Sequence, residues 1–218
     1  HETTSPSCAK AIVNFGANRV LYLATDPDNR TNGKGKSIME KAGIECIETR
    51  IYEGENSDVL KGYLKQKKTG LPYITLKIGS SINGKIATKN GESKWITNSL
   101  CRKRVQLLRS ENDGILIGKN SIIIDNPRLN LRDQFDEIEN KPIFILDTNF
   151  ALSDSENLLL FEKLGKEKVN IITNREPMDV ASKVSDFLKG VNIEKTVKEQ
   201  GSLNIEETLK IISRMGVN

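Results

Sequence analysis

The chain has 218 residues, enough for one large domain or two small ones, each with a buried core. Its 33 Lys and Arg and 29 Asp and Glu leave a net charge of +4, and the interspersed signs do not indicate a nucleic-acid-binding protein. No apolar run approaches the roughly 20 residues of a membrane-spanning helix, and no signal-peptide pattern is present. Three scattered cysteines argue against a disulfide framework and favour a reducing, cytoplasmic location.

Strand-like and helix-like segments alternate along the first third of the chain. Glycines end two predicted helices, apolar runs predict two strands, and Ser57 caps a third helix. In chain order these are a helix over 8–15, a strand over 19–25, a helix over 36–42, a strand over 46–52 and the helix from Ser57. The charged stretch that ends at Gly70 predicts a domain boundary, with one domain over 1–68 and a second over 72–218.

A second alternation begins at Pro72. Apolar runs predict strands over 73–78, 113–118, 141–147 and 168–173, and Asn83-Gly84 predicts a tight turn. A helix is expected from Asn98 or Ser99, with a buried stripe of Cys101, Val105 and Leu108, and a last helix over 204–215, with a stripe of Ile205, Leu209 and Ile212. Strands that alternate with helices predict an α/β fold with a largely parallel or mixed sheet covered by helices.

Two motifs that suggest familiar sites do not meet the requirements of those sites. The run from Gly33 to Ser37 is not a phosphate loop, because the required first glycine is replaced by Arg30, and we interpret it as a glycine-rich turn that enters a helix. A zinc site needs three or four ligands, whereas the sole histidine is His1 and Cys8 is the nearest cysteine. Spacing alone therefore does not favour zinc.

The stretch over 77–96 is the most unusual part of the chain. It holds three glycines and the only tryptophan, and small residues let a ligand approach the backbone closely. One interpretation is a ligand-binding loop in which Ser93 and Trp95 lie together. The other is a surface hairpin with Trp95 packed in the core.

Three charged residues further along have both a functional and an ordinary interpretation. Arg109 lies about 80° around its helix from Cys101, so it flanks the predicted stripe, where it either extends to solvent or reaches a cleft. Arg109 and Arg132 together could hold one phosphate. Asp125 follows an apolar run and precedes Asn126-Pro127, so it either ends a helix or handles protons.

Long segments of the chain resemble a known family. The runs PYITLKIGSSINGKIATKNGESKWIT, VQLLRS, DGILIG and IIIDNPRLNLR resemble the reductase domain of the bifunctional riboflavin-biosynthesis deaminase–reductases. The upstream run SPSCAKAIVNFGANRVLYLATDPDNRTNGKGKSIMEKAGIE resembles the end of their deaminase domain. The resemblance implies the remnant of a cytidine-deaminase-like αβα domain followed by a truncated dihydrofolate-reductase-like domain. It also implies that the chain is a fragment at both ends.

The resemblance also implies an activity. The reductase domain would use NADPH to reduce the ribosyl side chain of 5-amino-6-(5-phosphoribosylamino)uracil to ribityl. The upstream domain would remove an amino group from a pyrimidine with zinc. The partners implied are a small phosphorylated pyrimidine and a second copy of the chain in a homodimer, with neither nucleic acid nor membrane.

Site residues follow from the resemblance, position by position. Two of them, Lys77 and Asp125, would lie at the reaction centre. The positions implied to contact NADP are Gly79, Trp95, Ser121, Asp125 and Thr148. Those implied to contact the substrate are Ser93, Arg109, Leu129 and Arg132. Cys8 matches the last of three zinc ligands, and the other two and the proton-carrying glutamate would precede His1, just as a glycine-rich NADP segment would follow Asn218.

Two other functions stay open on the sequence. The chain could be a zinc-dependent pyrimidine deaminase with an accessory module, although only Cys8 of the ligand set is present. It could also be a non-enzymatic module that binds nucleotides or RNA, which an aromatic content of 5% does not favour.

Overall fold

The computed structural model describes residues 7–49, 57–132, 139–155, 157–184 and 186–218. The chain divides into two compact units, one of residues 1–73 with Asn218 and one of residues 74–217. Each unit has a core of its own.

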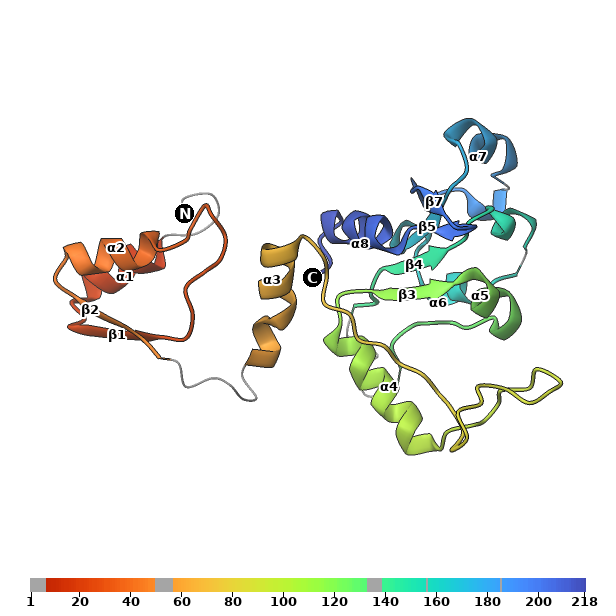
Figure 1. Cartoon of the computed structure of the whole chain (residues 1–218), viewed down its shortest axis with the longest axis horizontal. Coiled ribbons are helices and arrows are strands. Elements are labelled where there is room, and N and C mark those ends of the chain that lie inside the picture. The colour runs from red at the N-terminus through yellow and green to blue at the C-terminus, as the bar shows by residue number, and fades with distance from the viewer. Residues whose placement is uncertain (1–6, 50–56, 133–138, 156, 185) are drawn as a thin grey trace. The chain divides into compact units, whose positions relative to one another are not determined.

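The first unit pairs two short parallel strands and covers them with helices (Figure 1). Its elements are α1 (Cys8–Phe15), β1 (Arg19–Tyr22), α2 (Lys34–Lys41), β2 (Glu45–Glu48) and α3 (Ser57–Thr69). Ala9, Met39 and Ile44 form a small buried core. The N–H of Lys10 donates to the Ser7 hydroxyl at the start of α1, and Gly16 ends that helix in the left-handed conformation, with φ of 78°.

The helix over 8–15 is confirmed, and the other elements of this unit differ at their ends. The second helix begins at Lys34, two residues earlier than predicted. Strand β1 ends at Tyr22 because the N–H and hydroxyl of Thr25 bond to the Glu48 carboxylate, at 3.1 and 3.2 Å, in place of a continued ladder. Strand β2 ends at Glu48, and positions 50–52 of the predicted strand lie outside the described residues.

The second unit is a parallel sheet with helical connections. Its strands are β3 (Ile115–Gly118), β4 (Ile143–Leu146), β5 (Val169–Thr173) and β6 (Asn192–Lys195), which neighbour one another in that order. The helices are α4 (Ser99–Glu111), α5 (Lys119–Asp125), α6 (Leu160–Lys163), α7 (Pro177–Lys183) and α8 (Ile205–Arg214). A short antiparallel pair, β7 (Lys198–Glu199) and β8 (Ser202–Leu203), precedes α8.

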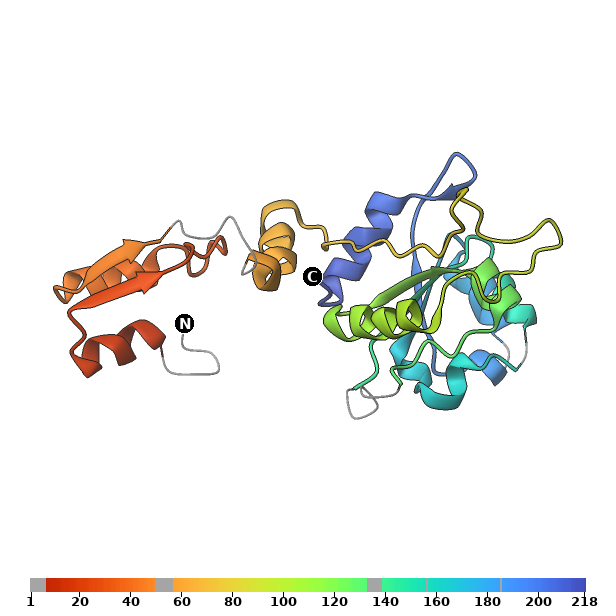
Figure 2. The ribbon, with the colours of Figure 1, turned by 90° about the horizontal axis from the view of Figure 1, so that it is seen from below.

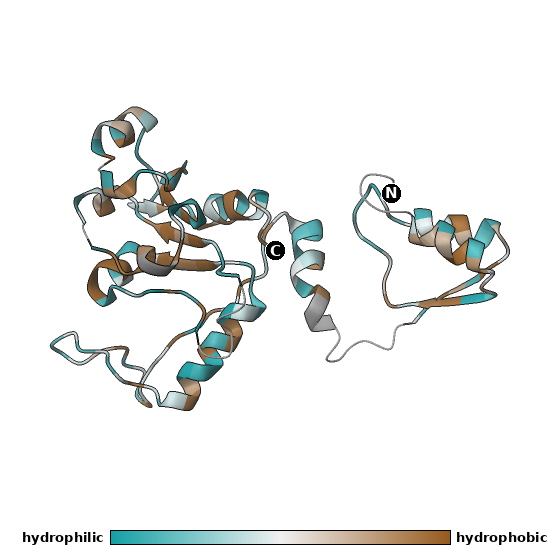
Figure 3. Cartoon of the chain, turned by 180° about the vertical axis from the view of Figure 1, so that it is seen from behind, coloured by the Kyte–Doolittle hydropathy of each residue, from teal (hydrophilic) through white to brown (hydrophobic). Residues whose placement is uncertain are grey.

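The central strands of this sheet are buried on both faces. All five residues of β5 are buried, which is typical of a parallel strand covered by helices on both sides. Ile143, Ile145 and Ile171 point into the main core, where Ile122 of α5 and Val180 of α7 meet them. The strands are among the brown, hydrophobic segments of Figure 3, and Figure 2 shows the helices around them. The predicted α/β class with a parallel sheet is confirmed.

Three sequence predictions for this unit are wrong. Residues 73–78 form no ladder with any described strand, and Leu76 and Ile78 are exposed. An apolar run becomes a strand only where a neighbouring strand accepts its hydrogen bonds. In α4 the buried residue is Gln106 rather than the exposed Cys101. In α8, Leu209 and Ile212 are buried as predicted, but Ile205 is exposed.

The two helix errors share one cause. Spacing tells which residues of a helix lie on one face, whereas the neighbouring elements decide how much of that face they cover. The helix starts themselves are confirmed: the side chains of Asn98 and Asn204 accept hydrogen bonds from the N–H of Cys101 and Glu207. The predicted tight turn is also present, with the N–H of Gly84 donating to Ser81.

Candidate functional site

A pair of arginines lies where α4 meets the segment that follows α5. Arg109 lies in the last turn of α4, and its Nη1 donates to the Asn130 carbonyl oxygen at 3.3 Å. Burial lowers the pKa of Arg109, and the nearby positive charge of Arg132 lowers it further. Among the described residues no carboxylate offsets these two charges. An anion bound between the arginines would do so.

The backbone that carries Arg132 is held by buried anchors. Asn126, in the left-handed conformation at the end of α5, accepts a hydrogen bond from the N–H of Leu159 at 2.8 Å and donates to the Asn157 carbonyl at 3.1 Å. Leu129 has a φ of 55°, which is costly for a branched side chain. Its side chain is part of the main core. Packing thus fixes the strained segment that leads to Asn130 and Arg132.

Two buried amides lie next to these arginines in the chain. Gln106, one turn before Arg109 on α4, and Asn130 are 6% and 9% exposed. Within the described ranges, neither amide oxygen has a hydrogen-bond partner. Buried amide oxygens without a donor cost free energy, so this region suits a ligand that brings hydrogen-bond donors as well as negative charge.

The carboxyl ends of the parallel strands carry a row of small polar residues. Asp147 and Thr148 follow β4, Thr173 ends β5, and Thr196 follows β6. Asp147 accepts the N–H of Leu152 with Oδ2 at 2.8 Å, while its Oδ1 and the Thr196 hydroxyl are buried without a partner in the described part of the chain. This edge is where ligands bind in open α/β sheets.

Helix α5 starts at the same edge, directly after β3. Ser121 and Asp125 lie four residues apart on it, so they share one face, and both are exposed. Asp125 is the last residue of the helix, as its ordinary interpretation expected.

The loop before α4 carries the remaining predicted residues. Lys77 folds back over Gly79, since a Cβ at Gly79 would lie 3.6 Å from the lysine Nζ. Ser93 is half-buried. Trp95 is 71% exposed, so a packing role in the core is wrong for it. The Arg102 guanidinium stacks 4.4 Å from the centre of the Trp95 rings.

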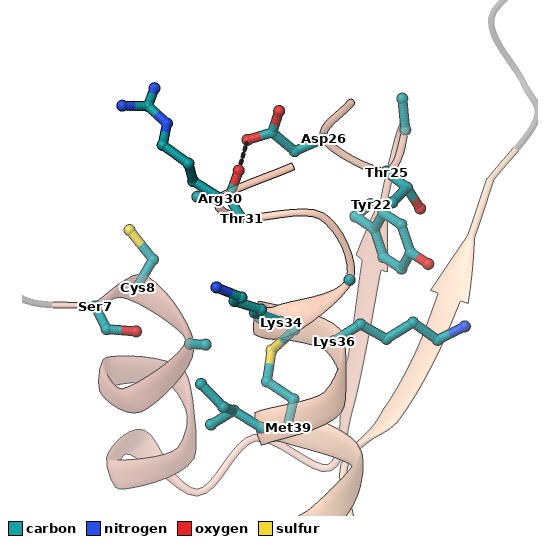
Figure 4. Close-up of a pocket in the computed structure, with 15 residues that line it drawn as sticks. Ser7, Cys8, Tyr22, Thr25, Asp26, Arg30, Thr31, Lys34, Lys36 and Met39 are labelled. Carbon is teal, nitrogen blue, oxygen red and sulfur yellow. Dashed lines mark hydrogen bonds between the residues drawn. The ribbon is translucent and has the colours of Figure 1, made fainter. Parts of the chain in front are cut away.

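A cavity of about 700 Å³ lies in the first unit, between α1, α2 and the turn after β1 (Figure 4). Cys8 lines it, and the Lys34 side chain points toward Cys8, whereas that of Lys36 points away toward Tyr22. Gly33 starts α2 with a φ of 66°, which fits the predicted glycine-rich turn. No group of three or more potential metal ligands occurs in the described ranges, and His1 lies outside them. The described residues therefore do not assemble a zinc site around Cys8.

Hydrogen bonds tie this turn to α3. The Tyr63 hydroxyl donates to Asp26 at 2.5 Å, and the Lys67 ammonium lies 3.0 Å from Asp28. The hydrogen bond from Tyr63 is the main reason that the pKa of Asp26 is lowered, and the same bond raises the pKa of Tyr63 to about 12.

Comparison with known proteins identifies the second unit. The sequence model of the protein family described as the RibD C-terminal domain matches residues 72–218. The chain belongs to the RibD C-terminal domain family. The riboflavin biosynthesis protein RibD of Bacillus amyloliquefaciens is 34% identical over 217 residues, which are 100% of this chain and 56% of that protein. RibD of Escherichia coli K12 is 36% identical over 132 residues, 61% of this chain and 36% of that protein.

Solved structures of RibD proteins show the same fold. RibD of Acinetobacter baumannii superposes with a TM-score of 0.80 at 29% identity, covering all of this chain and 57% of its own. A protein of Thermotoga maritima that is named a diaminohydroxyphosphoribosylaminopyrimidine deaminase and 5-amino-6-(5-phosphoribosylamino)uracil reductase gives a TM-score of 0.79 at 27% identity, covering all of this chain and 56% of its own. The chain thus spans little more than half the length of these relatives. The family resemblance drawn from the sequence is confirmed.

The structure brings together only some of the residues that the RibD resemblance implies. Arg109 and Arg132 are close enough to interact, and Lys77 lies beside Gly79. Sequence reasoning missed Gln106, Asn130 and Asp147. Asp147 had a usable signal, because a polar residue at the end of a predicted buried strand often faces a ligand. The two amides had none, since only packing shows that they are buried.

In the described residues, no helix is long and apolar enough to cross a bilayer.

Proposed function

We propose that the second unit of this chain is the reductase part of a riboflavin-biosynthesis enzyme. It would reduce the ribosyl side chain of 5-amino-6-(5-phosphoribosylamino)uracil to ribityl with NADPH. The observation that carries this proposal is the pair of Arg109 and Arg132, two neighbouring cations without a described counter-ion, one of them half-buried. A phosphorylated sugar supplies the missing negative charge, and a protein with the same fold is named for such a substrate.

The polar edge of the sheet fits a dinucleotide. Asp147 Oδ1 and Thr196 Oγ1 have no partner among the described residues and are buried at the carboxyl ends of β4 and β6, where a polar ligand would satisfy them. By the family resemblance, Gly79, Trp95, Ser121 and Thr148 would contact NADP. When bound, the nicotinamide supplies a hydride.

The residues of the chain would do the rest of the chemistry. Arg109 and Arg132 would hold the 5′-phosphate, and Ser93 and the strained Leu129 segment would position the sugar. Reduction of the ring-opened imine adds a hydride to C1′ and a proton to nitrogen. Lys77 and Asp125 are the candidates to deliver that proton, because the resemblance places Lys77 near the reaction centre and Asp125 at the NADP, and both side chains can carry a proton.

Residues 1–68 would be the C-terminal part of a deaminase domain with Cys8 in its zinc site, and residues 72–218 the N-terminal part of the reductase domain. Support comes from the Thermotoga protein, which is named for both activities and aligns with the whole chain. We further propose a cytoplasmic homodimer. The three described cysteines are unpaired, as in a reducing compartment, and light scattering tests the dimer, which a monomeric mass would contradict.

Steady-state kinetics of Arg109→Ala and Arg132→Ala test the proposed function. Loss of one charge-assisted contact costs about 1.5–3 kcal/mol, or roughly 10- to 150-fold in kcat/KM. The loss should appear with the phosphorylated substrate and nearly vanish with its dephosphorylated analogue. Asp125→Asn should lower turnover on both compounds alike. Equal losses on both compounds for the arginine variants would contradict the phosphate assignment.

A further inference from the structure

Arg175 stands at the carboxyl end of the sheet and is held there by two strands. Its backbone N–H donates to the hydroxyl of Thr173, the last residue of β5, at 3.3 Å. Its Nε donates to the carbonyl of Asn149, three residues after β4, at 3.3 Å. Thr173 is fully buried and donates in turn to the Thr148 carbonyl at 3.2 Å. The guanidinium is therefore oriented before any ligand binds.

The charges around Arg175 leave it available for an anion. The neighbouring carboxylate, Glu176, is occupied by the Lys195 ammonium at 2.6 Å. Within the described ranges Arg175 takes part in no ion pair, and its two Nη groups have no acceptor. The side chain is exposed. An oriented guanidinium with two free N–H groups matches the oxygens of a phosphate.

The position of Arg175 along the sheet edge indicates which phosphate. Strands β3, β4 and β5 are adjacent, with a spacing of about 4.8 Å. The residues that follow them, Ser121 on α5, Thr148 and Arg175, thus follow one another along the edge in strand order. A dinucleotide that lies along this edge, with its nicotinamide at the Ser121 and Asp125 end, brings its adenosine to β5.

We infer that Arg175 binds the 2′-phosphate on the adenosine ribose of NADPH and thereby sets a preference for NADPH over NADH. The inference rests on the proposed function and assigns a specificity-determining residue that the sequence resemblance did not. An arginine close to the adenosine ribose is a recurrent way to accommodate this phosphate.

The test uses titration calorimetry to measure how tightly this chain binds nucleotides that correspond to the adenosine half of NADPH. The probes are adenosine 2′,5′-bisphosphate and adenosine 5′-monophosphate, which differ only in the 2′-phosphate. The unmodified chain should bind the bisphosphate more tightly. Arg175→Ala should weaken bisphosphate binding at least about tenfold, the effect of one charge-assisted contact, and leave the monophosphate unchanged. Arg175→Lys should retain part of the preference.

Arg104→Ala provides the matched control, since Arg104 is an exposed arginine on α4, and it should leave both affinities unchanged. A bisphosphate preference that survives Arg175→Ala would overturn the inference and leave the proposed reductase intact. An unmodified chain without any such preference would overturn the inference as well. The proposed function has its own separate test, because the substrate-phosphate selectivity of the Arg109 and Arg132 variants does not depend on Arg175.

Discussion

Replacement of Arg109 by methionine should separate binding from stability. The arginine is half-buried, and burial and Arg132 both lower its pKa, so the folded state carries a cost for the charge. Methionine has a similar length and no charge. The variant loses the hydrogen bond to the Asn130 carbonyl, worth about 0.5–1.5 kcal/mol, but removes a half-buried charge that burial and Arg132 both disfavour. Because the two effects oppose each other, the expected free energy of unfolding lies within about 1.5 kcal/mol of that of the unmodified chain.

Denaturant unfolding with and without ribose 5-phosphate measures both effects. In the unmodified chain, the sugar phosphate at 100 times its dissociation constant should add about 2.7 kcal/mol to the free energy of unfolding. In Arg109→Met the same concentration should add much less, because the binding constant falls. Lys103→Met changes an exposed cation on the same helix and should alter neither quantity. A destabilisation of more than about 2 kcal/mol by Arg109→Met would show that the arginine supports the fold, and the reasoning would be refuted.

Two further predictions concern stability. Tyr63→Phe should lower the stability of the first unit by about 1 kcal/mol near neutral pH. Because the pKa of Asp26 is lowered, its hydrogen bond adds to the free energy of unfolding above the usual aspartate pKa, and this contribution is lost as the pH falls. Because the pKa of Tyr63 is raised, the contribution is also lost as the pH rises from about 10 to about 12. Identical pH profiles of unfolding for the two proteins would contradict this. Ile171→Ala, at a 1% exposed position in β5, should lower the free energy of unfolding by about 2–5 kcal/mol. Ile124→Ala, at a 75% exposed position, should lower it by less than about 0.5 kcal/mol. Denaturant unfolding measures both, and equal losses would contradict the assignment of Ile171 to the core.

The elements that the sequence predicted best are those with purely local causes. Helix α1 begins at Ser7, a capping residue, and ends at a left-handed Gly16, both readable as residue types. Strand β4 is a continuous apolar run and β5 is mostly apolar, and each lies within its predicted range. Helix α5 was not predicted, because seven residues rich in isoleucine are as typical of a strand as of a helix.

The sequence by itself determined the family, the α/β class, the helix caps and the residue types of a phosphate site, because these depend on motifs and on neighbours along the chain. Only the tertiary structure showed that Arg109 is half-buried near Arg132 without a described counter-ion, that Gln106 rather than Cys101 faces inward, and that residues 73–78 do not join the described sheet. Burial, charge compensation and strand pairing all depend on which segments pack together, and residues far apart in the sequence decide them.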